Sequence, residues 1–110
     1  MSRMTDFTVP STVPGRTLHA FCCEPEGEVR AVLQLSHGMV EFIDRYKPLA
    51  EYLAGQGIVV VGHDHLGHGG SIRTKADYGY FAEPDGNRAV LDDLHAMILR
   101  TKGRYPGVPY

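Results

Sequence analysis

Apolar and polar positions alternate loosely over residues 6–24 of the chain. A period of two is typical of a strand with one buried face, and Pro14-Gly15 interrupts the alternation with a favoured turn sequence. The apolar members of the alternation are Phe7, Val9, Leu18, Ala20 and Cys22. The pattern predicts a β-hairpin with Pro14-Gly15 at its tip.

Two short apolar runs, at residues 31–38 and 58–62, flank a segment with helical periodicity. Runs of this length and composition predict buried strands. Between them, Asp44 is placed to cap a helix that ends near residue 53 and has Pro48 in its first turn. One face of this helix is expected to carry Tyr46, Leu49, Ala50 and Leu53. Strand, helix and strand in this order predict a βαβ unit with parallel strands.

A second helical pattern covers residues 87–102, and a further apolar segment begins at residue 108. The apolar positions of this helix are Val90, Leu91, Leu94, Met97 and Ile98, and its polar residues Asp92, Asp93 and His95 are expected to face solvent. The aromatic residues Tyr78, Tyr80 and Phe81 precede it in an aperiodic segment and are expected to pack against the body of the protein. A parallel sheet needs both faces covered, which so few elements could hardly do. We therefore expect residues 1–110 to be an N-terminal fragment of one α/β domain, cut before a further strand.

Composition narrows the class of protein. With 110 residues, 43% hydrophobic and 22% charged, the chain suits a single globular unit at most. A net charge of −2 offers no basic surface for nucleic acid, and no apolar segment has the length of a signal peptide or membrane span, so a cytoplasmic location is expected. The adjacent Cys22 and Cys23 are expected to be reduced, because a vicinal disulfide is strained.

The sequence GHDHLGHGGS, residues 62–71, admits two interpretations. Three histidines, His63, His65 and His68, could bind zinc, and their order approaches the H-x-H-x-D-H ligand run of the metallo-β-lactamase superfamily. However, Gly67 stands where that run needs its aspartate. The pattern D-x-x-G-H-G-x-S is instead typical of a tight turn whose polar side chains hold the backbone. This second interpretation, with structural histidines, is favoured.

Upstream, the sequence HGMVEFIDRY, residues 37–46, follows the first predicted parallel strand. Open parallel sheets place their sites at this edge, and backbone amides in such a loop can stabilise an oxyanion. Glu41 and Arg45 are four residues apart and could form an ion pair at the start of the helix. Ser36 and Ser71 are not expected to be nucleophiles: Ser36 is predicted to be a core strand residue, and the sequence places no base beside Ser71.

Together, HGMVEFIDRY, GHDHLGHGGS and the final RYPGVPY resemble the N-terminal part of an α/β-hydrolase. The similarity is greatest to the monoacylglycerol lipase and lysophospholipase branch, the serine aminopeptidase-like hydrolases, and it extends over residues 7–110. That branch shows H-G-x-x-E-x-x-x-R-Y, then D-x-x-G-H-G-x-S, then a strand leading to a G-H-S-x-G nucleophile elbow.

The resemblance implies roles for residues of both motifs. The backbone amide of Met39 would be one oxyanion-hole donor, and its loop would be supported by His37, Gly38, Glu41 and Arg45. A structural loop would comprise Asp64, Gly67, His68, Gly69 and Ser71. None of these is the family's catalytic serine, acid or base, which would all lie beyond Tyr110.

The resemblance also implies a function: the N-terminal part of a serine hydrolase that cleaves carboxylic esters, with monoacylglycerols or lysophospholipids as substrates and no metal or cofactor. The chain alone is predicted to be inactive, because no member of the triad is present. An alternative is a non-catalytic remnant, or one half of a two-chain assembly that pairs with the remainder of the fold, or with itself, through an open sheet edge. The third hypothesis is the histidine-rich metal-binding domain, which the turn motif disfavours.

Overall fold

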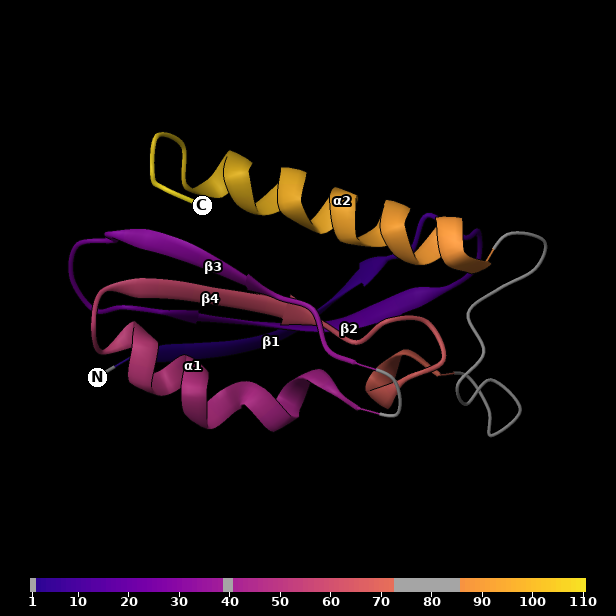
Figure 1. Cartoon of the computed structure of the whole chain (residues 1–110), viewed down its shortest axis with the longest axis horizontal. Helices are drawn as coiled ribbons and strands as arrows, with labels where there is room; N and C mark the ends of the chain where they lie inside the picture. The colour runs from indigo at the N-terminus through magenta and orange to yellow at the C-terminus, as the bar shows by residue number, and fades with distance from the viewer. Residues whose placement is uncertain (1, 39–40, 73–85) are drawn as a thin grey trace.

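The computed structural model describes residues 2–38, 41–72 and 86–110, and these form a mixed sheet with a helix on each face (Figure 1). The strands are β1 (Arg3–Pro10), β2 (Thr17–Glu24), β3 (Ala31–Leu35) and β4 (Ile58–His63). The helices are η1 (Ile43–Tyr46), α1 (Lys47–Ala54), η2 (Gly69–Ser71) and α2 (Gly86–Arg104), where η denotes a 3₁₀ helix. Figure 1 shows α1 and α2 on opposite sides of the sheet. Tyr78, Tyr80 and Phe81 lie outside the described residues.

The predicted hairpin is confirmed. Strands β1 and β2 pair antiparallel from Arg3 opposite Glu24 to Pro10 opposite Thr17. Gly15 in the connecting turn has a φ of 78°, a conformation that glycine adopts without the steric cost of a side chain.

The predicted βαβ unit is confirmed as well. Strands β3 and β4 pair parallel, with Ala31 opposite Ile58 and Leu35 opposite Gly62, and η1 and α1 connect them. Strand β4 also pairs antiparallel with β2, which gives the strand order β1-β2-β4-β3. The hairpin and the parallel unit therefore share one sheet, and β3 forms its outer edge.

The two faces of the sheet bury separate apolar clusters because successive side chains on a strand point in opposite directions. Cys22 packs with Val59, Val61 and Met97 on the face covered by α2. The other face, covered by α1, buries a cluster that comprises Phe21, Cys23, Ile43, Ala50, Ala54 and Val60. The two cysteines are buried and free, as predicted, since the pleat directs them to opposite faces.

The start of the first helix differs from the prediction. The chain first makes the 3₁₀ turn η1. Phe42 occupies the N-cap position of η1, and its side chain forms no capping hydrogen bond. The predicted cap, Asp44, lies inside η1 and directs its carboxylate to His19 Nε2 at 2.9 Å. The predicted apolar face is also partly wrong, because Leu49 is 45% exposed while Ala50 and Ala54 are buried.

Helix α2 corrects two further expectations. Met97 is buried as predicted, but Leu91 is 61% exposed. Asp93 was expected on the solvated face and is instead 1% exposed. Its carboxylate accepts hydrogen bonds from Ser11 Oγ at 2.9 Å and from the Thr12 backbone N–H at 2.7 Å, so it joins α2 to the turn of the hairpin.

Two other polar residues of α2, Asp92 and His95, lie toward solvent, as predicted. The exposed Asp92 carboxylate pairs with Arg88, and His95 is exposed.

The last residues of the chain lie against the outer edge of β3. The Val32 N–H donates to the Pro109 carbonyl at 2.9 Å, and the Tyr110 hydroxyl donates to Gln34 Oε1.

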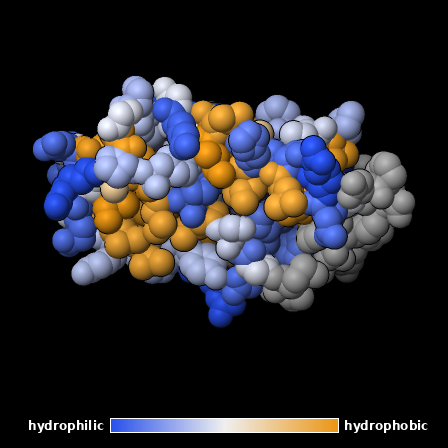
Figure 2. All heavy atoms as spheres, turned by 45° about the horizontal axis from the view of Figure 1, so that its top comes forward, coloured by the Kyte–Doolittle hydropathy of each residue, from blue (hydrophilic) through white to orange (hydrophobic). Residues whose placement is uncertain are grey.

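The face of the molecule seen in Figure 2 carries separate groups of apolar residues between hydrophilic ones. The large apolar side chains exposed on β3 and α2 are Leu33, Leu91 and Leu99. Within the described ranges, no helix combines the length and the hydropathy that a membrane span needs.

Candidate functional site

One carboxylate connects Gly38, which follows β3, to Tyr46 at the end of η1. Glu41 Oε1 accepts a hydrogen bond from the Gly38 N–H at 2.8 Å and another from the Tyr46 hydroxyl at 2.8 Å. The hydrogen bond from Gly38, followed by that from Tyr46, lowers the pKa of Glu41, so its carboxylate is charged at neutral pH. Arg45 Nη1 lies 3.6 Å from Glu41 Oε2, which confirms the predicted i, i+4 pair. Met39, the predicted oxyanion donor, lies outside the described residues.

His37 connects the end of β3 to the turn after β4. Its Nε2 accepts a hydrogen bond from the His65 backbone N–H at 3.0 Å, and its Nδ1–H donates to the Gly38 carbonyl at 2.7 Å. These two bonds fix the imidazole in the Nδ1–H tautomer. The parallel pairing places the C-terminal ends of β3 and β4 at the same edge of the sheet, and the buried His37 side chain joins them.

Asp64 organises the turn that follows β4. Its Oδ1 accepts from the Ile43 N–H at 2.7 Å, and its Oδ2 accepts from the Gly70 N–H at 2.8 Å. Ile43 is the first residue of η1, so Asp64 supplies from 21 positions away the cap that was predicted for Asp44. A carboxylate buried to 1% exposure with two short amide hydrogen bonds is a strong anchor.

The glycines of this turn are required by its geometry. Gly67 has a φ of 77° and Gly69 a φ of 46°, where side chains are strained. A Cβ at Gly69 would lie 2.4 Å from the Asp64 carboxylate, so a larger residue would displace that anchor. The tight-turn interpretation of residues 64–71 is therefore the one that the geometry supports.

Ser71 and His68 are also part of the turn. Ser71 Oγ donates to the Asp64 carbonyl at 2.7 Å and accepts from the His19 backbone N–H at 3.0 Å. His68 Nδ1–H donates to the Leu66 carbonyl at 3.0 Å. The five predicted loop residues thus lie together, and they are tied to β2 through His19, a link that the sequence did not suggest.

The remaining imidazoles are held without charge. Burial lowers the pKa of His63 to about 3 and that of His65 to about 4. Neither ring nitrogen of His63 has a hydrogen-bond partner among the described residues. The His63 and His65 rings meet edge to face with centroids 5.1 Å apart. In the part of the chain that the structure describes, the side chains close enough to share one ion are Asp6, His19 and Asp44, so the geometry gives no support to zinc binding by His63, His65 and His68.

Ser36 lies beyond the end of β3 and is exposed, which corrects the prediction of a core strand residue. Its Oγ forms a hydrogen bond with His65 Nε2 at 3.0 Å. A serine beside an imidazole is the arrangement of a nucleophile and its base. With a pKa of about 4, however, His65 is too weak a base to take the serine proton near neutral pH.

Comparisons with known proteins agree on one group of enzymes. The family model described as serine aminopeptidase, S33, matches residues 27–110. Over 110 residues the chain is 31% identical to the monoglyceride lipase of Homo sapiens, an alignment that covers 92% of this chain and 32% of that protein.

Solved structures agree with this fold. A thermostable carboxyl esterase from Bacillus coagulans has a TM-score of 0.87 at 24% identity and covers 97% of this chain with 34% of its own. A soluble variant of monoglyceride lipase from Saccharomyces cerevisiae has a TM-score of 0.74 at 20% identity, with 97% of this chain and 33% of its own covered. The chain thus spans about a third of the length of these proteins. The predicted fold class, the N-terminal portion of an α/β-hydrolase, is confirmed.

Proposed function

Because the chain belongs to the serine aminopeptidase S33 family, we propose that it forms the oxyanion-loop side of the active site of a serine hydrolase that cleaves carboxylic esters. The observation that carries this proposal is the hydrogen-bond frame around residues 37–38 and 64–71. The bonds from Gly38 to Glu41, from His65 to His37 and from Ile43 to Asp64 connect residues 37–38 to the start of η1 and to the turn after β4, at the carboxyl edge of the sheet. Open parallel sheets place their active sites at that edge.

The same bonds indicate which amide would meet the substrate. The Gly38 N–H is already engaged by Glu41 and therefore cannot also stabilise an oxyanion. The next amide along the chain is that of Met39, and we assign it as the oxyanion donor. Glu41 then acts as a positioning residue, since it fixes the peptide immediately before the donor.

The serine, the histidine and the acid of the triad would come from the rest of the enzyme. In the complete site the serine Oγ attacks the acyl carbon while the histidine takes its proton, and the oxyanion forms beside the Met39 amide. The alcohol leaves with that proton, and water then hydrolyses the acyl-enzyme. This sequence uses no metal or cofactor. Similarity to monoglyceride lipases favours a monoacylglycerol or a lysophospholipid as the ester.

Residues 1–110 by themselves are not expected to turn over an ester, because the proposed triad would come from the rest of the enzyme and the loss of one member already costs orders of magnitude in rate. The purified chain is therefore expected to hydrolyse p-nitrophenyl butyrate no faster than a heat-denatured sample and to remain unlabelled by a fluorophosphonate. Turnover above that control, or labelling of Ser36 or Ser71, would contradict the proposal.

A chimaera tests the positive part of the proposal. In it, this chain replaces the aligned N-terminal third of human monoglyceride lipase. We expect hydrolysis of a monoacylglycerol, and a reduction of kcat by about tenfold or more in a Glu41→Ala chimaera, because one oxyanion donor contributes about 100-fold or more. The matched control is Arg45→Ala, whose exposed ion pair should affect kcat by less than about threefold. A folded chimaera in which Glu41→Ala leaves kcat unchanged argues against this role of Glu41.

A second candidate function is a non-catalytic module that associates through the edge of β3. The observation that favours it is the exposure of Leu33, 38%, on β3, the outermost strand of the sheet on that side. Under either candidate, two expectations stay predictions: that residues 1–110 are the N-terminal fragment of a single α/β-hydrolase domain, and that the location is cytoplasmic.

A further inference from the structure

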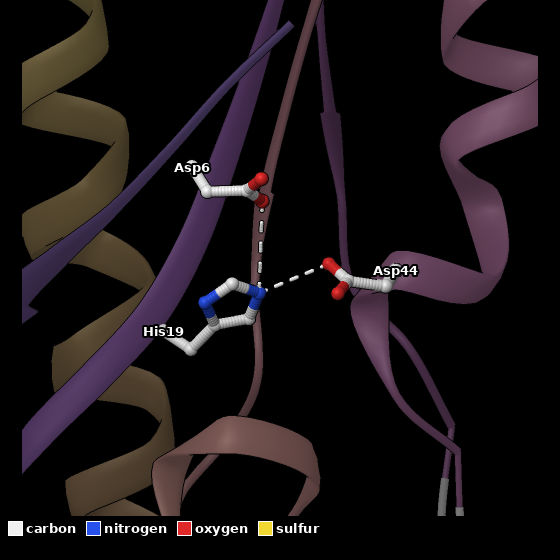
Figure 3. Close-up of side chains that lie close together, drawn as sticks. All are labelled: Asp6, His19 and Asp44. Carbon is white, nitrogen blue, oxygen red and sulfur yellow. Dashed lines mark hydrogen bonds and ion pairs between the residues drawn. The ribbon is translucent and has the colours of Figure 1, made fainter.

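Three possible metal ligands from three different elements converge beside η1 (Figure 3). Asp6 lies on β1, His19 on β2 and Asp44 on η1. One ligand atom of each lies within 4.8 Å of those of the other two. The proposed hydrolase chemistry uses none of these side chains.

The separations are close to those of ligands that share one ion. His19 Nε2 lies 2.9 Å from Asp44 Oδ1 and 3.9 Å from Asp6 Oδ1. Ligands about 2.1 Å from a tetrahedral zinc ion stand about 3.4 Å apart, so side-chain shifts below about 1 Å would complete the arrangement.

The fold fixes the central ligand. The His19 N–H donates to Ser71 Oγ at 3.0 Å, and its carbonyl accepts from the Asp64 N–H at 2.8 Å. In the hairpin register Thr8 stands opposite His19, so Asp6, two residues away, lies diagonally across on the same face. The His19 side chain is 22% exposed.

Lys47 supplies a cation to the same carboxylates. Its Nζ lies 2.8 Å from Asp6 Oδ1 and 3.6 Å from Asp44 Oδ1. An ammonium group on a flexible four-carbon chain neutralises one of the two negative charges and can swing away when a divalent ion arrives. Lys47 would therefore compete with a metal without blocking the ligands.

We propose that Asp6, His19 and Asp44 bind a divalent transition metal of the zinc class, with Lys47 as an internal competitor. One imidazole with two carboxylates is a ligand set that zinc accepts, and a fourth position remains for water. The ion would join β1, β2 and η1. It would thereby fix the hairpin to the segment that follows the His37–Gly38 turn.

Calorimetric titration of the 110-residue protein with zinc chloride tests this site. We expect saturable binding of one ion per chain, and a loss of affinity of at least about tenfold in His19→Ala and in Asp44→Ala. Lys47→Met is expected to raise the affinity several-fold, since it removes the competing cation and leaves the three ligands in place. Unfolding could not produce such a gain.

The matched control is His95→Ala, which removes an exposed histidine from α2 and should leave the titration unchanged. Loss in His19→Ala together with gain in Lys47→Met supports the site. The absence of saturable binding, binding that survives His19→Ala, or an affinity that Lys47→Met does not raise overturns it.

Discussion

Two buried imidazoles, His63 and His65, constrain the chemistry available at the carboxyl edge of the sheet. Burial lowers the pKa of each well below neutrality, so neither provides a positive charge there. An oxyanion formed beside them would have to be stabilised by backbone amides, as we propose for Met39. Because these pKa values lie below those of histidines in the unfolded chain, the two residues make the free energy of unfolding depend on pH.

We expect stability to fall as the pH is lowered from about 6.5 toward 4. In this range an unfolded histidine with a pKa near 6.5 takes up a proton, while His63, with a pKa of about 3, does not. Acid therefore favours the unfolded state, by about 1.4 kcal/mol per pH unit for each such histidine. Urea unfolding of the wild type and of His63→Leu at several pH values measures this contribution.

The leucine variant should show a shallower pH dependence, reduced by about one proton per chain, because leucine does not titrate. His95→Ala, at an exposed position, should keep the slope of the wild type. Identical slopes for His63→Leu and the wild type would mean that His63 takes up its proton in the folded state.

At the scale of elements, the start of η1 depends on a residue from another part of the sheet. Asp64, directly after β4, accepts the hydrogen bond of the Ile43 N–H and also that of the Gly70 N–H. The hydrogen bond that caps η1 therefore depends on the position of β4, which directly precedes Asp64.

Asp64→Ala is expected to reduce the free energy of unfolding by about 3 kcal/mol, because two buried amides lose a charged acceptor. Asp44→Ala, which removes partly exposed ion pairs, should cost less than about 1 kcal/mol. Urea denaturation of both variants gives the comparison. Equal costs would restore Asp44 as the residue that anchors this helix.

Helix α2 is attached to the hairpin by Asp93. The carboxylate accepts hydrogen bonds from both Ser11 and Thr12, residues 82 and 81 positions away in the sequence. This contact holds α2 against the end of the sheet where the hairpin turn lies.

Asp93→Ala should destabilise the protein by about 2–3 kcal/mol, because the hydroxyl and amide donors at the hairpin turn lose their buried acceptor. Asp92→Ala is the matched control on the same helix. It removes an exposed pair with Arg88 and should change stability by less than about 0.5 kcal/mol. Thermal unfolding followed by circular dichroism distinguishes the two, and similar losses would mean that the Asp93 contact contributes nothing in solution.

At the scale of the whole molecule, sequence periodicity predicted the elements and their connection. The hairpin, the βαβ unit and α2 follow from local patterns, and the structure has all of them. Three details could not be predicted, because they depend on contacts distant in sequence: the burial of Asp93, the capping by Asp64 and the exposure of Leu49. Of the proposed site, the motif spacing predicted the loop residues, while the link through His19 needed the strand pairing.

Exposed apolar residues on β3 and α2 predict self-association of the isolated chain. Light scattering with size-exclusion chromatography is expected to show a mass that rises with protein concentration, because Leu33 and Leu91 favour burial against a second surface. Leu33→Lys on β3 should lower the association, whereas Thr5→Lys at an exposed position of β1, the strand at the other edge of the sheet, should leave it unchanged. A concentration-independent monomer would remove the support for the non-catalytic module.

The contact between Val32 and Pro109 also bears on the way this sheet is assembled during translation. Of the four strands in the described residues, β4 is the one that lies between two strands synthesised before it, since the order is β1-β2-β4-β3. Residues 108–110, which follow α2, then reach the outer side of β3 and need not displace any earlier pairing. A sheet of this order can grow outward at one edge while its first hairpin, at the other, stays undisturbed.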